Sequence, residues 1–409
     1  MCSSLDDRTK GAWIVHHTCK MNEVINASIE YEQINLAGKC GLVLSAIVSD
    51  GEQTMKLGKV EALAKASGIT KLELPQILEE LERQQLIDRS ENEVAILGLS
   101  ISSVLGHINT IYTEANPTPK EEAVIELSEM VSNVPRFSEE IGEYISDNYR
   151  LSSTEVEGLL IASSEVGFVD AEQTRDKRKV LFNGNLFRKQ EVEKISAVIN
   201  SLTNEESRKV STLNQLLIAQ GCVPYETAIG IVGLECFLKV QSIGLFDVNT
   251  IGNPYGNFKF VTRPAAFSKF SNTIADDAFD MAKALVTSLT YGMTRSSSSR
   301  GRIKRIELLM ARLIDGHWVG AATAIGQDYQ ILELKGVIDV REESNGRFSM
   351  RLLKKEVGQL ALAVIQEGDG STEAILNRLP GASVTTYQSP EINREFVRKK
   401  QKPQVKQSI

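Results

Sequence analysis

The sequence contains few of the residues that usually carry catalysis or bind metals. Its 409 residues include only four histidines and five cysteines. The cysteines lie at positions 2, 19, 40, 222 and 236, a spacing that matches neither a disulfide framework nor a zinc motif. An odd number of scattered cysteines is typical of free thiols in a reducing compartment, so we expect no disulfide.

Sequence signatures of enzymes are also absent. The chain has no Gly-x-x-x-x-Gly-Lys-[Ser/Thr] phosphate loop and no Gly-x-Gly-x-x-Gly fingerprint, so nucleotide hydrolysis and dinucleotide chemistry lack their usual motifs. A nucleophilic pair of Cys222 or Cys236 with a histidine is one alternative, and a zinc site is another. Such a zinc site would draw on scattered side chains: Cys2, His16, His17, Cys19 and Cys40. We predict instead a protein that is not an enzyme and holds no cofactor or metal.

Long apolar runs are missing as well. The most apolar candidate span, residues 222–240, is interrupted by Pro224, Glu226 and Glu235, which argues against a membrane helix. Residues 1–11 carry acids where a secretory signal would carry bases. With 46 bases and 53 acids, the net charge of -7 argues against a surface coated everywhere by nucleic acid. We therefore expect a soluble, cytoplasmic protein without membrane contact, on which any nucleic acid binds local basic patches.

What the sequence does contain is a pattern that recurs about four times. Each copy has three apolar-periodic helices followed by two strands that a polar turn joins into a hairpin, or wing. With 42% hydrophobic residues, the chain can bury a sizeable core. The sequence thus predicts a mainly helical α+β fold of about four tandem units with short β-hairpin wings. The copies are expected at residues 36–101, 118–188, 189–264 and 301–366.

The segments outside the four copies have other expected roles. Residues 1–35 form an N-terminal extension, and residues 265–300 are expected as a linker helix followed by a mobile Ser-rich linker. Residues 367–409 lose apolar periodicity and include a basic stretch. We expect them to form a disordered tail that is dispensable for folding from Gly368 onward.

Local signals place individual helices within the copies. Thr118 with Glu121, and Ser152 with Glu155, have the spacing of capping boxes at helix N-termini. In the third copy the apolar pattern predicts helices at 191–201, 204–219 and 225–242, so that the last of these would be its third helix.

One stretch of the first copy resembles a known DNA-binding motif. The run from Val60 to Thr70 (VEALAKASGIT), with the run from Ile77 to Ile87 (ILEELERQQLI), is similar to the helix-turn-helix of bacterial winged-helix regulators. Together with the order and spacing of elements over residues 36–353, this resemblance points to the winged-helix superfamily and to no particular family. It implies a third helix that enters the major groove and a wing that touches the flanking DNA backbone.

The charges of the expected third helices do not suit that role. The first carries Glu73, Glu79, Glu80 and Glu82 against Lys71 and Arg83, and the second carries three glutamates and no base. Phosphates repel such faces, which also lack the side chains that read base edges. A solvated face or a protein contact is the alternative interpretation.

Bases concentrate elsewhere, in two groups. The second wing and the residues after it carry Arg175, Lys177, Arg178, Lys179, Arg188 and Lys189. The Ser-rich linker and the residues after it carry Arg295, Arg300, Arg302, Lys304 and Arg305 without an intervening acid. These are the candidate nucleic-acid contacts, since their charges and the nearby Gly and Ser residues let phosphates approach.

Two functions fit these observations. The first is a non-enzymatic DNA-binding protein, a regulator or a subunit of a DNA-handling assembly, that contacts phosphates through its basic wings and linkers. The second is a scaffold whose acidic winged-helix surfaces bind partner proteins. The basic groups favour the first function, and the acidic third helices with the net charge of -7 favour the second.

Overall fold

The computed structural model describes residues 5–21, 24, 27–50, 52–99, 103–270 and 276–370. Within these residues the protein is mainly helical and contains four small antiparallel sheets of three strands each. The expectation of a mainly helical α+β fold is confirmed. None of the described helices has the length and apolar character that crossing a membrane requires. The basic stretch near Lys399 lies outside the described residues.

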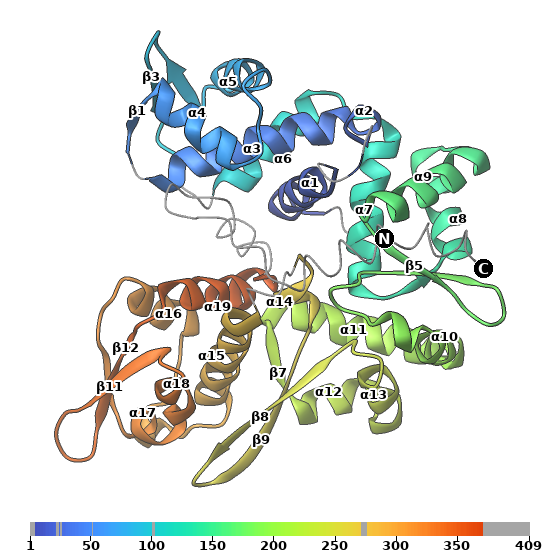
Figure 1. Cartoon of the computed structure of the whole chain (residues 1–409). Helices are drawn as coiled ribbons and strands as arrows, with labels where there is room; N and C mark the ends of the chain where they lie inside the picture. The colour runs from blue at the N-terminus through green and yellow to red at the C-terminus, as the bar shows by residue number, and fades with distance from the viewer. Residues whose placement is uncertain are drawn as a thin grey trace, which may run out of the picture.

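Four units with the same order of elements recur along the chain, each a helix, a short strand, two helices and a β-hairpin. In Figure 1 they occupy four corners of the view, from unit 1 in blue to unit 4 in orange. Unit 1 contains α3 (Glu32–Asp50), β1 (Thr54–Lys56), α4 (Leu57–Ala66), α5 (Leu74–Arg83), β2 (Ile87–Arg89) and β3 (Glu93–Ile96). Unit 2 contains α7 (Pro119–Asn133), β4 (Arg136–Phe137), α8 (Ser138–Tyr149), α9 (Ser153–Val166), β5 (Asp170–Gln173) and β6 (Lys179–Phe182).

The later units repeat this order. Unit 3 contains α11 (Asn204–Gln220), β7 (Cys222–Pro224), α12 (Tyr225–Val232), α13 (Leu234–Gln241), β8 (Asp247–Asn253) and β9 (Gly256–Thr262). Unit 4 contains α16 (Ile306–Ile314), β10 (Val319–Ala322), α17 (Thr323–Asp328), α18 (Gln330–Leu334), β11 (Ile338–Glu342) and β12 (Phe348–Leu352). The capping boxes predicted at Thr118 and Ser152 are both present, at the starts of α7 and α9.

Each unit has a sheet of three strands, whereas the sequence predicted only the two strands of the hairpin. The additional strand precedes the second helix of its unit and pairs with the last strand, as Met55 does with Val94 and Phe137 with Val180. The strand order is therefore the same in all four sheets. These additional strands have two to four residues. That length is too short for a period-two pattern, so the sequence alone did not reveal them.

The third unit begins later than the sequence predicted. The single helix expected at 225–242 is two helices, α12 and α13, separated at Gly233 with φ 86° and ψ 146°. A residue with a side chain would be strained in this conformation, so glycine permits the break. Buried side chains such as Val232 and Phe237 continue the apolar pattern across it. As a result, α11 is the first helix of unit 3, and α10 (Val192–Ser201) connects units 2 and 3.

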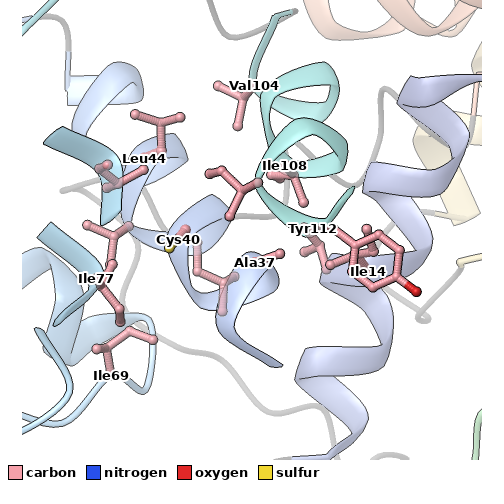
Figure 2. Packing of buried hydrophobic residues seen from close by; sticks show 14 of the residues in the cluster. Ile14, Ala37, Cys40, Leu44, Ile69, Ile77, Val104, Ile108 and Tyr112 are labelled. Carbon is pink, nitrogen blue, oxygen red and sulfur yellow. The ribbon is translucent and has the colours of Figure 1, made fainter. Parts of the chain in front are cut away.

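The N-terminal extension contributes a central helix to the fold. Helix α1 (Asp7–Met21) packs against α3 and α6 (Val104–Glu114), and its Trp13 is only 1% exposed. Figure 2 shows Ile14 of α1 beside Tyr112 of α6, with Cys40 and Leu44 of α3 nearby. Gly11 permits the close approach of α1 to α6, since a Cβ there would lie 2.1 Å from the Leu105 carbonyl oxygen. The described part of the N-terminal extension is thus packed into the core of unit 1.

The expected linker helix is also part of a core. Helix α15 (Asp276–Thr294) packs against α19 (Lys355–Glu367), and its Leu285, Val286 and Leu289 are buried in the same apolar cluster as unit 4. The Ser-rich run after it, expected to be a mobile linker, includes a 3₁₀ turn at Ser298–Arg300. Ser296 is buried, and the Ile303 amide donates a hydrogen bond to the Gly292 carbonyl. These contacts hold the run against the end of α15.

A buried lysine connects parts of the chain that are far apart in sequence. Lys269 follows α14 (Ala265–Ser268), is 2% exposed, and its Nζ lies 3.0 Å from Glu129 Oε2 in α7. It also forms an ion pair with Asp369, just beyond α19. Burial opposes the charge of Lys269, but the two carboxylates raise the pKa of the ammonium above its ordinary value. We call Glu129, Lys269 and Asp369 the Lys269 cluster.

Further hydrogen bonds surround the Lys269 cluster. Trp13 of α1 donates its indole N–H to Glu129 Oε2 at 2.7 Å. Arg263, after β9, donates to the Gly368 carbonyl at 2.7 Å. The Gly370 amide donates to the Ala266 carbonyl. Residues 368–370 are therefore bound to the body of the protein, so the predicted start of a dispensable tail at Gly368 falls inside the folded structure.

His17 lies next to this region and is fully buried. Its Nε2 lies 3.0 Å from Ser128 Oγ, which itself donates to the Val124 carbonyl, so the imidazole is the donor. Nδ1 has no partner among the described residues. Burial, with a smaller contribution from the charge of Lys20, lowers the pKa of His17 from 6.5 to about 3. The folded protein therefore holds His17 neutral.

Replacing Lys269 should cost much more stability than replacing a lysine in an exposed ion pair. The substitution Lys269→Met leaves Glu129 and Asp369 without their buried partner, so we expect the free energy of unfolding to fall by about 3–5 kcal/mol. Lys283 is a matched control because its ion pair with Asp247, 3.0 Å long, is partly exposed. Lys283→Met should cost about 1 kcal/mol or less. Urea denaturation measures both, and equal losses would contradict the role assigned to Lys269.

The neutral state of His17 should make the folded protein acid-sensitive. Between pH 6.5 and about 3 the unfolded chain binds a proton at this residue that the folded chain does not, so stability is lost as the pH falls. We expect the advantage of the wild type over His17→Gln to shrink by roughly 2 kcal/mol from pH 7 to pH 4.5. Urea titrations of both proteins across this range measure the difference. Parallel stability curves would show that His17 does not titrate in this way.

Candidate nucleic-acid interface

The first group of predicted bases lies on the wing of unit 2. Arg175 and Lys177 occupy the turn between β5 and β6, where Lys177 has φ 68°. Arg188 lies just beyond β6, and all three side chains are exposed. None of them has a carboxylate oxygen within 4.0 Å among the described side chains. Lys179 is half-buried and lines a groove between α8 and α9.

Two members of this group are engaged in the fold. The Arg178 guanidinium lies 3.4 Å from the centre of the Phe137 ring and donates to Asn200 Oδ1 at 3.1 Å. Lys189 lies 3.3 Å from Glu172 and 3.5 Å from Asp170, both on β5. Partial burial opposes its charge, yet these carboxylates raise the pKa of Lys189. Both side chains are less available to phosphates than the sequence suggested.

The second group divides in the same way. Arg295 forms an ion pair with Glu226 of α12 at 2.7 Å. Arg300 lies 2.8 Å from Asp328 at the end of α17, and its guanidinium lies 4.3 Å from the centre of the Tyr255 ring on the β8–β9 turn. The Asp328 side chain has no exposed surface. Arg300 therefore joins unit 3 to unit 4, and Arg295 holds the segment after α15 against unit 3.

The last three bases border a groove on unit 4. Arg302, Lys304 and Arg305 line this groove, of about 360 Å³, together with strand β10. Arg302 Nε donates to the Met293 carbonyl at 2.8 Å. Lys304 and Arg305 are exposed and have no carboxylate within 4.0 Å among the side chains that the structure describes. Their charges remain available to a ligand.

The sheet of unit 4 also carries a tryptophan in contact with two arginines, which the sequence pattern did not reveal. Trp318 directly precedes β10, and its ring lies 4.2 Å from the Arg341 guanidinium and 4.9 Å from that of Arg351. Carboxylates hold both arginines, as Arg351 lies 2.8 Å from Asp339 across the β11–β12 ladder. Only the sheet register brings the three side chains together. We call Arg302, Lys304, Arg305, Trp318, Arg341 and Arg351 the unit 4 basic surface.

The two predicted groups of bases do not form one surface. The wing of unit 2 and the sheet of unit 4 lie on opposite sides of the view in Figure 1. Two of the third helices, α5 and α9, remain acidic. On α5 the only arginine, Arg83, is paired with Glu80 at 2.7 Å, and on α13 the single base, Lys239, is paired with Glu235 at 3.3 Å. Phosphates would thus meet repulsion at α5 and α9.

The described residues give no geometric support to a nucleophilic cysteine or to a zinc site. Cys222 is buried, and desolvation raises the pKa of its thiol to about 12, which disfavours a nucleophilic thiolate. Cys40 is buried with a pKa raised to about 12 for the same main reason. Among the residues with described positions, no three His, Cys, Asp or Glu side chains are grouped to hold a metal ion. Cys2 lies outside the described residues.

Comparison with known proteins does not assign the chain to a family. No protein-family model matches the sequence, and no curated protein is significantly similar to it.

Replacing bases from the same linker should have unequal effects on stability. Arg300→Ala leaves the buried carboxyl of Asp328 without its ion-pair partner, so we expect a loss of about 3 kcal/mol in the free energy of unfolding. Lys304→Ala with Arg305→Ala removes two exposed charges that have no carboxylate partner among the described side chains, and should change the free energy of unfolding by about 0.5 kcal/mol or less. Chemical denaturation measures both variants. A double variant as unstable as Arg300→Ala would show that these two bases are structural.

Proposed function

We propose that this chain is a non-enzymatic protein of four tandem winged-helix units that binds duplex DNA through the unit 4 basic surface. The winged-helix assignment is supported by the order helix, strand, helix, helix and hairpin in each unit. It is further supported by the shared strand order of the four sheets. Its buried free thiols, such as those of Cys40 and Cys222, fit a reducing compartment, so we propose that it acts in the cytoplasm.

The observation that carries the DNA-binding proposal is a pair of bases at the unit 4 groove that have no carboxylate partner among the described side chains. Lys304 and Arg305 face solvent, so a phosphate can bind them without displacing a carboxylate. Gly301 and Gly320 line the same groove, and their lack of side chains lets the segment before α16 and strand β10 pack closely, since a Cβ on Gly301 would lie 2.4 Å from Ala322. Trp318 with Arg341 and Arg351 supplies a further basic group on the sheet of the same unit.

The wing of unit 2 provides a second contact in this proposal. Arg175, Lys177 and Arg188 are exposed there, but acids such as Asp176 and Glu193 lie in the same segment. Glu193 also accepts a hydrogen bond from the Arg175 amide at 2.8 Å. We therefore assign this wing a weaker, sequence-independent attraction for phosphates.

A scaffold is the second candidate function. It is favoured by the groove between α8 and α9. Four exposed carboxylates lie along the rim of this groove, and apolar side chains form its floor. Such a groove suits a basic protein segment rather than a nucleic acid, because phosphates would be repelled.

Removing the two free bases should weaken DNA binding in a salt-dependent way. We expect Lys304→Ala with Arg305→Ala to lower the affinity for a generic duplex at about 50 mM salt. The slope of log K against log salt should flatten by about 0.9 for each phosphate that the variant no longer neutralises. Fluorescence anisotropy titrations at several salt concentrations measure both quantities.

The control is a variant with the same loss of charge on unit 1, Lys65→Ala with Lys71→Ala, which should bind as the wild type does. Both control lysines are exposed. Absence of wild-type binding at low salt, or equal slopes for both double variants, would contradict the proposal and leave the scaffold function.

A further inference from the structure

A groove with an apolar floor and an acidic rim lies between α8 and α9 of unit 2. Its volume is about 710 Å³, and Val156 and Leu160 of α9 with Gly142 of α8 form part of its floor. Ile161, also in its lining, is 45% exposed. Its rim carries four exposed carboxylates: Glu139, Glu143, Asp147 and Glu157.

The rim carboxylates have no counterions within the described structure. No Lys, Arg or His nitrogen lies within 4.0 Å of any of the four among the described side chains, whereas the neighbouring Glu140 pairs with Arg178. Glu139, Glu143 and Asp147 follow one another at four-residue intervals on α8, so their like charges face each other and destabilise the helix. A bound cationic segment would relieve this repulsion and cover the apolar floor.

We propose that this groove binds the basic segment 392–402 of the same chain. That segment carries Arg394, Arg398, Lys399, Lys400 and Lys402 against a single acid, Glu395. It also contains apolar side chains, Ile392, Phe396 and Val397, that suit the floor. Its charge and composition are thus complementary to the groove, and the inference does not rest on DNA binding.

The described structure places the start of this part of the chain within reach. Gly370 is hydrogen bonded to Ala266, close to Lys269, whose carbonyl accepts a hydrogen bond from Asn183. Asn183 directly follows β6, and Lys179 at the other end of that strand lines the groove. A four-residue strand spans about 13 Å. The residues between Gly370 and Ile392 can extend over roughly 70 Å, which is ample for docking within one chain.

Docking within one chain also has a thermodynamic advantage. A tethered segment has an effective concentration of the order of millimolar, so modest contacts suffice for occupancy. Because the rim is exposed, the attraction should be screened by salt, with a Debye length of about 8 Å at physiological ionic strength. We therefore expect segment 392–402 to occupy the groove at low salt and to leave it as the salt concentration rises.

Carbodiimide cross-linking of the full chain tests this docking, because the reagent joins carboxylates to lysines in contact. A mixture of ¹⁴N- and ¹⁵N-labelled protein distinguishes links within one chain from links between chains. We expect links from Lys399, Lys400 and Lys402 to the rim carboxylates within one chain, fading as salt rises. Absence of these links at low salt, or links found only between chains, would overturn the proposal, the latter by assigning the groove to a second copy.

A variant that fills the groove separates docking from the mere presence of carboxylates. Gly142→Leu keeps all four rim acids, and its Cβ would meet Val156 at an ordinary 3.5 Å. The matched control is Gly158→Leu on α9, where an added Cβ has open space around it. We expect the cross-link yield to fall about fivefold in Gly142→Leu and to stay unchanged in Gly158→Leu. Equal yields in the two variants would refute docking in this groove.

Reversing the charge of exposed rim side chains provides a second test, in which the rate of proteolysis of segment 392–402 is measured. Glu139→Lys with Glu143→Lys should accelerate trypsin cleavage after Arg398, Lys399 and Lys400 about tenfold, because the segment is released. The control Glu79→Lys with Glu91→Lys makes the same charge change on exposed positions of unit 1 and should leave the rate unchanged. Melting temperatures confirm that each variant is folded. Equal cleavage rates would contradict the proposal.

Discussion

The buried ammonium of Lys269 sets the constraint on which the arrangement of the units depends. A charge that is removed from water is costly unless it is paired, so Glu129 and Asp369 must both lie beside it in the folded state. Glu129 belongs to α7 of unit 2, and Asp369 follows α19, which packs with unit 4. Trp13 adds α1, and thereby unit 1, through the same carboxylate. One ion cluster thus links segments from both ends of the described chain.

The same principle separates the bases that hold the fold from those that are free to bind a ligand. Arg178 and Arg300 stack on the rings of Phe137 and Tyr255, and each also faces a carboxylate. Lys304 and Arg305 have neither kind of partner among the described side chains. The number of bases in a stretch of sequence therefore overstates the positive charge that a phosphate can reach. This difference is why the DNA-binding proposal rests on unit 4 rather than on every predicted cluster.

The acidic surfaces have an equally specific distribution. On α5 and α13 the acids are partly neutralised, as Glu80 is by Arg83 and Glu235 by Lys239. On α8 the acids of the groove rim remain without such partners among the described residues, beside an apolar floor. Repulsion of phosphates at the third helices and attraction of a basic segment at α8 are consequences of one charge pattern. Units with the same order of elements can thus present surfaces of different chemistry.

The sequence by itself determined the local structure, because helix starts and turns depend on residues close together in the chain. The capping residues Thr118 and Ser152 begin α7 and α9, and most expected helices and hairpins of units 1 and 2 are present. The break between α12 and α13 at Gly233 was not predicted, because the pattern of buried apolar side chains continues on both sides of it. The strands β1, β4, β7 and β10 were not predicted either, because strands this short are recognised only by their hydrogen bonds to a neighbouring strand.

Only the tertiary structure decided which side chains meet. Glu129 and Lys269 are 140 residues apart along the chain, Asp369 lies much farther on, and no local pattern relates the three. The same holds for Arg300 with Tyr255, and for Trp318 with Arg341 and Arg351, whose contacts follow from packing and strand register. Availability of a charge depends on such distant neighbours, since ion pairing and burial are set by proximity in space. The candidate bases were therefore visible in the sequence, while their division into structural and free groups was not.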